Sequence, residues 1–500
     1  MKFKYADKQV EIPFEFKTKP YEHQRKVVAD TALSPYWAYF LEMGCGKSKI
    51  LLDKVSVLAS INKIKAAVII APKGVYSNWV NKEIPQHFQM SSEHNASPYI
   101  ILKWGDKTRA FKEIWKELLD PKFNPQGFIF FVINIEALSS KSGVQALNDF
   151  LSKFAPECLI CCDESTVIKN PKAKRTVAAV KAAHRCFYRA ILTGSPVTKS
   201  PLDLYAQCAF LKQGILGHTS FYTFRNEYAI MKEQVNPYNG ATYKQIVGYQ
   251  NEDKLRNILK KFSTRITKQE CLDLPEKIYT TREVEMTPEQ KSYYDAIKKE
   301  NLALLENGDQ ISAQIAITRL LRMHQIVCGC TKTDSGEEII IKNNRVAELM
   351  DILAETSGKA IIWANYRANI KEIMEAIKKE YGEKSVVSYF GDTSTADREL
   401  AVKRMQEDPE CRFFVGNTQT GGYGITLTAA TTTIYYSNNY DLEKRLQSED
   451  RNHRIGQNSN VHYIDIITPG TVDLKILKAL KAKMNIADTI LDDDPKEWLL

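Results

Sequence analysis

The chain contains 500 residues, 44% of them hydrophobic and 26% charged, with ten cysteines and a formal net charge of +9. This length exceeds one ordinary domain, and the composition is typical of a globular protein, which excludes repeat arrays and low-complexity chains. The net positive charge weakly favours a polyanionic partner.

The sequence contains no evident secretion or membrane signal. The N-terminal residues lack the apolar core of a signal peptide, and the longest apolar runs have the length of a strand rather than of a membrane span. Cys158 and Cys161 form a C-x-x-C pattern without a second pair at zinc-site spacing, so we interpret the cysteines as buried hydrophobic residues. We therefore expect a reducing compartment: the cytoplasm of a prokaryotic or phage-infected cell, or the nucleus of a eukaryotic one.

Short apolar runs alternate with helical patterns from about residue 37 to residue 200. Four runs read as strands because Pro, Gly, Asn or Asp bounds them: 66–72, 128–134, 158–162 and 189–194. A second series stands at 360–365, 385–390, 413–417, 433–438 and 461–467. Strands that alternate with helices predict a parallel sheet covered on both faces, so we expect an α/β protein with two lobes.

The region between the two series, at about 200–340, has helical patterns, and we expect helical insertions there. The boundaries that follow are a first lobe at 1–275 with a helical insertion at about 200–270, a linker with a second insertion at 276–340, and a second lobe at 341–500 that ends in a helix. The proline of DLPEK marks the linker.

The segment LEMGCGKSKILL, which starts at Leu41, predicts a phosphate-binding loop followed by a helix. Gly44 and Gly46 allow backbone N–H groups to approach phosphate oxygens without a Cβ in the way. Lys47 can reach the β- and γ-phosphates, Ser48 can ligate Mg²⁺, and the helix directs its positive end toward them. Leu41 occupies the position of the first glycine of a complete P-loop, so a simple turn before a helix is the alternative.

The apolar run CLICC ends in two adjacent carboxylates, Asp163 and Glu164. Solvent exposure at a strand end is one explanation for this pair of like charges. The other is that Asp163 holds Mg²⁺ and Glu164 orients or deprotonates an attacking water, while neighbouring cations offset the repulsion. Together with the phosphate loop upstream, the pair favours an ATP site.

Two arginines stand in the segment QSEDRNHRIGQ near the C-terminus. The pattern predicts a helix that enters a glycine turn, and the three-residue spacing would place Arg451 and Arg454 on one helix face. Such arginines can stabilise the charge that spreads over a transferring phosphoryl group. The alternative is a surface pair that bridges to Glu449 or Asp450.

Segments in a fixed order carry a resemblance to a known family. They are KPYEHQ (19–24), EMGCGKS (42–48), IIAPKGVYSNWVNKEI (69–84), DESTVIKN (163–170), LTGSPVTKSPLDLYAQCAFL (192–211), IIWANY (361–366), GNTQTGGYGITLTAA (416–430) and QSEDRNHRIGQ (447–457). On these residues the chain resembles the superfamily-2 helicase-like ATPases of the Swi/Snf type, from about Lys19 to about Lys483. In the order given, the segments correspond to the Q motif and motifs I, Ia, II, III, IV, V and VI. The resemblance implies two RecA-like lobes with parallel sheets, helical insertions near their junction, and ATP and Mg²⁺ as ligands.

The resemblance also implies roles for individual residues. The implied catalytic residues are Glu164, Arg451, Arg454 and Lys47. The implied ATP-binding residues are Gln24, Gly44, Cys45, Gly46, Lys47, Ser48, Asp163, Gly424 and Gln447, with Ser48 and Asp163 as the metal ligands. Thr193, Ser195 and Asp450 would couple hydrolysis to lobe movement. Two departures from the family pattern, Thr166 in motif II and Ser195 in motif III, concern this coupling rather than the chemistry.

Double-stranded DNA is the partner that the resemblance implies, contacted along its phosphate backbone. The candidate contacts are Pro72, Lys73, Asn134, Lys169, and Thr420, Gly421 and Gly422 in motif V. Six Lys or Arg residues without an acid occur from Lys169 to Arg185, and a nucleic-acid stripe and a solvated helix face explain them equally well. The segments 221–230 and 320–329 resemble helical protrusions that brace the duplex.

We therefore expect a monomeric, nucleic-acid-dependent ATP hydrolase that moves along double-stranded DNA, in recombination, repair or replication-fork processing. An RNA-dependent ATPase or helicase, and an ATP-gated nucleic-acid clamp without translocation, are the alternatives. Stimulation of ATP turnover by duplex DNA rather than RNA would decide against the first, and displacement of a triplex third strand against the second.

Overall fold

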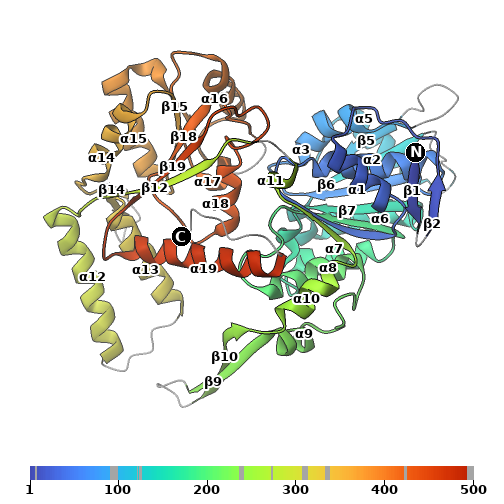
Figure 1. Ribbon diagram of the computed structural model, residues 1–500, viewed down its shortest axis with the longest axis horizontal. Helices are drawn as coiled ribbons and strands as arrows, with labels where there is room; N and C mark the ends of the chain where they lie inside the picture. Colours follow the sequence, from blue (N-terminus) through green and yellow to red (C-terminus); the bar gives the residue numbers. More distant parts are fainter. Residues whose placement is uncertain are drawn as a thin grey trace. The chain divides into compact units, whose positions relative to one another are not determined.

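The computed structural model describes residues 1–5, 8–90, 99–120, 122, 127–235, 241–271, 274–306, 313–332, 338–421 and 425–491. By its internal contacts the chain forms two compact units. Unit 1 comprises Met1–Ile230, Val247–Asp273 and Ile486–Asp493, and unit 2 comprises Met231–Ile246, Leu274–Asn485 and Asp494–Leu500. Each unit has its own parallel sheet (Figure 1).

The sheet of unit 1 has, in the described part of the chain, seven strands in the order β11–β3–β8–β7–β4–β6–β5. Every neighbouring pair is parallel. The strands are β3 (Tyr36–Leu41), β4 (Ala66–Ala71), β5 (Tyr99–Lys103), β6 (Phe128–Asn134), β7 (Cys158–Asp163), β8 (Tyr188–Leu192) and β11 (Ser263–Ile266). The strand β4 is buried over its whole length, which explains why its sequence AAVIIA is continuously apolar rather than alternating.

Helices pack on this sheet and form the connections between its strands. They are α1 (Glu22–Thr31), α2 (Lys47–Ser60), α3 (Tyr76–Asn78), α4 (Ile84–His87), α5 (Arg109–Leu119), α6 (Lys141–Phe154), α7 (Lys174–Ala183), α8 (Leu204–Leu211), α9 (Phe221–Tyr228), α10 (Glu252–Leu259) and α11 (Lys268–Cys271).

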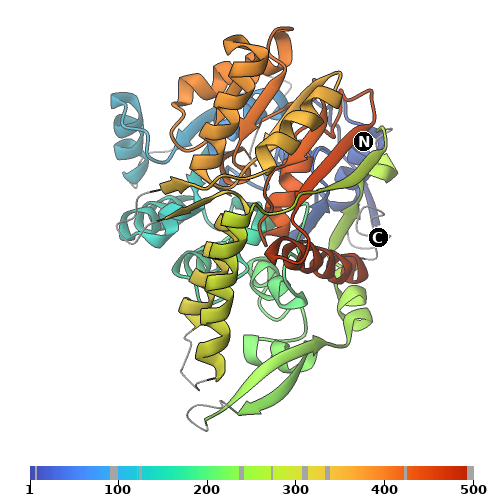
Figure 2. The same ribbon diagram turned by 90° about the vertical axis from the view of Figure 1, so that its left-hand side faces the viewer.

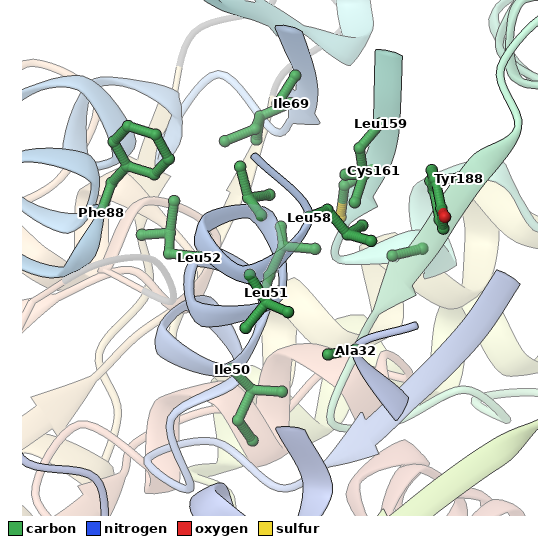
Figure 3. Packing of buried hydrophobic residues seen from close by; sticks show 14 of the residues in the cluster. Ala32, Ile50, Leu51, Leu52, Leu58, Ile69, Phe88, Leu159, Cys161 and Tyr188 are labelled. Carbon is green, nitrogen blue, oxygen red and sulfur yellow. The ribbon is translucent and has the colours of Figure 1, made fainter. Parts of the chain in front are cut away.

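The helix α2 is the best buried of the helices that bear on function. Its residues Ile50, Leu51 and Leu52 are fully buried and pack in one cluster with Ile69 of β4 and Leu159 of β7 (Figure 3). Burying a side chain of this size stabilises the fold by about 1.5–3 kcal/mol. The packing therefore fixes the start of α2, and with it the loop that precedes the helix.

The sheet of unit 2 has, in the described residues, six parallel strands in the order β12–β19–β18–β15–β17–β16. The strands are β12 (Lys277–Glu283), β15 (Lys359–Trp363), β16 (Val386–Tyr389), β17 (Phe413–Gly416), β18 (Ala430–Tyr435) and β19 (Val461–Ile467). The helices are α12 (Pro288–Glu306), α13 (Ala313–Val327), α14 (Arg345–Glu355), α15 (Arg367–Tyr381), α16 (Thr395–Glu407), α17 (Thr418–Gly421), α18 (Leu442–Glu449) and α19 (Val472–Leu491). The start of α19 packs by an apolar stripe, Val472, Ile476 and Leu480, against Val327 of α13 and Leu442 of α18.

The two parallel sheets confirm the predicted fold class, two RecA-like α/β lobes. The predicted strands of both series are all present within one to three residues of their expected bounds. The prediction that the region at about 200–340 is helical was wrong in part. It contains α8, α9, α10, α12 and α13, but β11 and β12 also lie there and each joins a central sheet.

Two small sheets also occupy the region that we expected to be helical. The helix α9 leads directly into β9 (Ala229–Val235), which pairs with β10 (Thr242–Tyr249) to form a long ribbon (Figure 2). The strands β13 (Cys330–Lys332) and β14 (Glu338–Ile340) form an antiparallel pair. In β10 the sequence TYKQIVGY is rich in β-branched and aromatic residues, which favours a strand, and the helical interpretation gave this too little weight.

The cysteines agree with their interpretation as small hydrophobic residues. All are free thiols, and all except Cys271 are buried. Near the N-terminus, β1 (Lys2–Tyr5) and β2 (Lys8–Glu11) form an antiparallel pair. Across the described ranges, none of the helices is both long enough and apolar enough to cross a bilayer.

Candidate functional site

The predicted phosphate loop connects the end of β3 at Leu41 to the start of α2 at Lys47. Gly44 and Gly46 have φ values of +90° and +81°, a left-handed conformation that side chains disfavour. Because Gly46 is the N-cap residue, α2 begins without a side-chain cap, and its first backbone N–H groups face the loop. The Lys47 ammonium donates to the carbonyl oxygens of Leu41 (3.0 Å) and Glu42 (3.4 Å), so it lies across the loop.

Gln24 of α1 packs directly on this loop. It is 3% exposed, its Oε1 accepts from the backbone N–H of Tyr21 (3.1 Å), and its Nε2 donates to the carbonyl of Cys45 (3.4 Å). A Cβ on Gly46 would lie 2.1 Å from Gln24 Nε2, so only glycine fits there. The structure thus brings Gln24 and the loop glycines together, as predicted.

Cys45 contributes to the loop through its backbone. Its carbonyl also accepts from His23 Nε2 (2.9 Å). Its side chain is buried against Cys271, with 3.3 Å between the two sulfur atoms, and burial raises the pKa of the Cys45 thiol. Neither His23 nor Cys271 was predicted to contact the loop, and no sequence pattern connects Cys271 to a segment 226 residues earlier.

The predicted acid pair stands at the carboxyl end of β7. Asp163 is the last residue of the strand, and Glu164 follows in a left-handed conformation with φ +47°. Asp163 Oδ2 accepts from the indole N–H of Trp79 (2.8 Å), and its Oδ1 accepts from the backbone N–H of Glu164 (3.0 Å). Burial raises the pKa of Asp163, whereas the Trp79 hydrogen bond and the Lys47 charge oppose this effect. The neighbouring cation that was expected to offset the repulsion is therefore the phosphate-loop lysine.

The predicted coupling residues of motif III contact the acid pair. Thr193 Oγ1 donates to Glu164 Oε2 (3.5 Å) and accepts from the backbone N–H of Ser195 (3.2 Å). This short chain of hydrogen bonds connects motif III to the predicted water-orienting carboxylate.

Trp79 and Arg265 hold the site in unit 1, and we had not predicted either role. Trp79 was noted only as part of motif Ia. Arg265 of β11 donates through Nη1 to the carbonyls of Phe40 (3.0 Å) and Gly194 (3.1 Å) and pairs with Glu42. It thereby ties the edge strand to the phosphate loop. A single arginine in a short strand gives no pattern from which this contact could be predicted.

The prediction that Arg451 and Arg454 share a helix face was wrong. The helix α18 ends at Glu449, and both arginines follow it in a turn. They nevertheless point toward the same place, because Nη1 of Arg451 (3.1 Å) and Nη1 of Arg454 (3.4 Å) both donate to the carbonyl of Ile425. Convergence onto one carbonyl, rather than helical spacing, brings the two guanidinium groups together.

Two further predicted residues support the arginines. The carbonyl of Gln447 accepts from Arg451 Nε (2.8 Å), and Gln447 itself is fully buried. Asp450 is the C-cap residue of α18 and stands directly before Arg451. Of the predicted motif V residues, Gly422 and Gly424 lie outside the described residues. Gly421 ends α17, and a Cβ there would lie 2.6 Å from the Trp363 ring.

Three candidate nucleic-acid contacts in unit 1 lie together. Pro72 and Lys73 follow β4, and Asn134 ends β6, the neighbouring strand, where it pairs in register with Ala71. The carboxylate of Glu136 accepts from the backbone N–H of Lys73 (3.2 Å) and from Asn134 Nδ2 (3.2 Å). Glu136 therefore organises this edge of the sheet.

The other candidates lie elsewhere. The Lys169 ammonium donates to Thr198 Oγ1 (2.6 Å) in unit 1, and Thr420 belongs to α17 of unit 2. Within the basic run, Lys172, Lys174, Lys181 and Arg185 are exposed on and around α7. This exposure agrees with both explanations of the run, a nucleic-acid stripe and a solvated face.

The residues of unit 1 fit a nucleoside triphosphate with Mg²⁺. The two left-handed glycines open a cradle that a Cβ would fill, and the uncapped start of α2 and the Lys47 ammonium supply the donors that phosphate oxygens need. The Ser48 hydroxyl and the Asp163 carboxylate are hard oxygen ligands of the kind that Mg²⁺ prefers.

Comparisons with known proteins agree with this geometry. The SNF2-related domain matches residues 40–332, and the helicase conserved C-terminal domain matches residues 342–456. Among curated relatives, the TATA-binding protein-associated factor MOT1 of Saccharomyces cerevisiae is 27% identical over 66% of this chain and 20% of its own length. The putative ATP-dependent helicase/translocase YwqA of Bacillus subtilis is 25% identical over 68% of this chain and 36% of its own length.

The Zorya protein ZorD of Escherichia coli is 26% identical over 84% of this chain and 39% of its own length. The chain thus spans well under half the length of these relatives. Two solved structures were also found. The Sulfolobus solfataricus SWI2/SNF2 ATPase core in complex with dsDNA is 23% identical, with a TM-score of 0.42, and covers 97% of this chain and 96% of that chain. The Sulfolobus solfataricus SWI2/SNF2 ATPase core domain is 22% identical, with a TM-score of 0.40, and covers 99% and 95%.

The first of the two matched domains alone accounts for more than half of the chain, and the second follows it directly. The chain therefore belongs to the SNF2-related family, as a helicase-like ATPase with a helicase C-terminal domain.

Proposed function

We propose that this protein couples ATP hydrolysis to movement along double-stranded DNA. One observation carries the proposal: the phosphate loop and the acid pair are assembled around the start of α2, with Lys47 and Asp163 in electrostatic contact. A nucleotide site of this kind has a clear use in a motor, because hydrolysis can then drive a change in lobe arrangement.

Each residue of the site has a distinct part in the proposed reaction. Gln24 reads the adenine, the N–H groups of α2 and Lys47 hold the phosphates, and Glu164 orients or deprotonates the attacking water. Arg451 and Arg454 stabilise the negative charge that develops on the γ-phosphoryl group. Cys45 and Gly424 border the nucleotide, and Gln447 supports Arg451 through its carbonyl.

Ser48 and Asp163 are the residues that would hold Mg²⁺. The ion, when bound, neutralises charge on the phosphate oxygens. The hydrogen bond from Trp79 keeps Asp163 oriented and favours its ionised form, which is the form that binds a cation.

Duplex DNA is the proposed track, contacted through its phosphates by Pro72, Lys73, Asn134 and Lys169 in unit 1 and by Thr420, Gly421 and Gly422 in unit 2. A net charge of +9 supports a polyanionic partner. The name of the relative YwqA includes both helicase and translocase. By family analogy we place the activity in recombination, repair or replication-fork processing, carried out by a monomer.

The proposal is tested by ATP turnover measured with duplex DNA, single-stranded DNA and RNA of equal length. We expect the greatest stimulation with the duplex. Equal or greater stimulation by RNA would favour an RNA-dependent ATPase. A triplex whose third strand is displaced only during ATP hydrolysis would identify translocation, and an intact triplex despite rapid turnover would favour an ATP-gated clamp.

A further inference from the structure

The chain enters unit 2 through residues 274–279, the connecting segment. Its last residues begin β12, an edge strand that pairs in parallel with β19 from Lys277↔Val461 onward. The segment is therefore a fixed part of the second sheet from its third or fourth residue.

The connecting segment bonds directly to motif VI. The Lys277 ammonium lies 2.9 Å from Glu449 Oε2, and the Tyr279 hydroxyl donates to the same oxygen at 2.8 Å. His453 Nε2 donates to the carbonyl of Pro275 at 2.8 Å. Three contacts thus join six residues of connecting segment to the five residues Glu449–His453, and Arg451 stands in the middle of that stretch.

Glu449 is fully buried, and its second oxygen is also held. Arg445 Nε donates to Glu449 Oε1 at 2.9 Å, and the same guanidinium pairs with Asp465. Burial alone would raise the pKa of Glu449, but Lys277 and Arg445 outweigh it and set the pKa at about 2. The carboxylate is therefore ionised at neutral pH, and each of its oxygens has a cationic partner.

The position of Glu449 in the chain makes these bonds matter for the arginines. It is the last residue of α18, so it sets where the helix ends and in which direction the following turn leaves. Arg451 is two residues further on, and Arg454 five. The turn is otherwise held from the opposite side, where the carbonyl of Arg451 accepts from the backbone N–H of Leu427 (2.8 Å).

We propose that Lys277 and Tyr279 are positioning residues for Arg451 and Arg454 and act on them through Glu449. The segment by which the chain enters the second lobe then sets the direction of the arginines. This proposal rests on the proposed function, because it assigns the arginines to the ATPase reaction.

The test compares Lys277→Met, which removes the charge and keeps most of the length, with Arg282→Met on the same strand. Arg282 pairs with Glu348 and Glu355 at the surface and has no printed role in motif VI. We expect Lys277→Met to lower kcat on the order of 10²-fold, as small misplacements of catalytic groups do. The Kd for ATP should stay within about twofold, because unit 1 supplies the phosphate-binding groups. Lys277→Arg should recover most of the activity, and Arg282→Met should match the parent.

A structural defect is separated from positioning by combining the variants. If Lys277 acts through the arginines, Lys277→Met should cause little further loss in an Arg451→Ala/Arg454→Ala background, because the groups it positions are gone. A full additional loss of kcat there would overturn the proposal. Tyr279→Phe, which loses one hydroxyl and keeps the ring, provides a second and milder variant that should lower kcat in the same way.

Failure of this proposal can be told apart from failure of the proposed function. If Lys277→Met and Tyr279→Phe keep parental kcat while Arg451→Ala and Arg454→Ala abolish turnover, the positioning role is refuted and the ATPase assignment stands. If the arginine variants also turn over normally, the role of motif VI itself is refuted.

Discussion

Gly46→Ala is the change whose consequence follows most directly from the coordinates. The backbone of Gly46 has φ +81°, and a left-handed conformation costs a residue with a Cβ about 1–2 kcal/mol. The new Cβ would lie 2.1 Å from Gln24 Nε2, so the amide has to move. Gln24 is buried and would lose its bonds to Tyr21 and Cys45, each worth about 0.5–1.5 kcal/mol. We expect unit 1 to lose about 2–5 kcal/mol of stability.

Gly105→Ala is the matched control. Gly105 has φ +86°, but nothing lies within 4 Å of an added Cβ, so this variant carries the backbone strain without the collision. Urea unfolding should show a loss of about 1–2 kcal/mol for Gly105→Ala and a larger loss for Gly46→Ala. Calorimetric titration should show weaker ATP binding for Gly46→Ala alone, because only that change displaces the proposed adenine reader.

The reasoning predicts a specific interaction between the two positions. In a Gln24→Ala background the collision no longer exists, so Gly46→Ala should cost only its backbone strain and the two changes should be non-additive. Equal losses of stability for Gly46→Ala and Gly105→Ala, or strict additivity with Gln24→Ala, would refute the packing argument.

Three further predictions concern the reaction and its track. Lys47→Ala should weaken ATP binding, whereas Arg454→Ala should still bind ATP but turn it over about 10³-fold more slowly or worse; normal turnover by Arg454→Ala would contradict the motif VI assignment. Burial raises the pKa of Asp163 and the Trp79 indole opposes it, so Trp79→Phe should raise that pKa further and move the acidic limb of the turnover–pH profile to higher pH. Trp37→Phe, which loses a bond to a neutral hydroxyl, should leave the limb in place. The logarithm of the DNA association constant should fall linearly with the logarithm of salt concentration, and a flat dependence would argue against backbone contacts.

The parts of the fold that the sequence predicts are those that depend on local pattern. Continuous apolar runs such as AAVIIA predict buried parallel strands, and the structure has them. The strands β11 and β12 were missed because they are half-exposed edge strands whose residues, STRI and KIYTTRE, are too polar for that pattern. Their place is decided by pairing with β3 and β19, which are more than 180 residues away in the sequence.

The site divides in the same way. Gly44, Lys47, Asp163 and Glu164 belong to short motifs whose spacing carries chemical meaning, so their roles can be proposed from the sequence. The groups that hold them, such as Trp79 and Arg265, come from distant strands and loops and have no spacing to betray them. The placement of Arg451 and Arg454 after α18 was missed for another reason: helical periodicity continues on paper past the residue at which the helix ends.

The chain has two pairs of adjacent acids at the ends of core elements, Asp163–Glu164 and Glu449–Asp450, and the structure resolves their repulsion in the same way. In each pair the first carboxylate is turned into the protein and bonded, Asp163 by Trp79 and Glu449 by two cations. Taking a carboxylate out of water costs several kcal/mol unless partners replace the lost hydration.

A carboxylate that is buried and bonded in this way can hardly rotate, because any other orientation would leave it without partners. The residues that follow it are therefore fixed in direction: Glu164 after Asp163, and Arg451 after Glu449. In each unit the residue proposed to act on the phosphate stands one or two positions beyond an immobilised acid. On this argument, removing the partners of Asp163 and of Glu449 should impair the same reaction, the first through the water-orienting carboxylate and the second through the arginines.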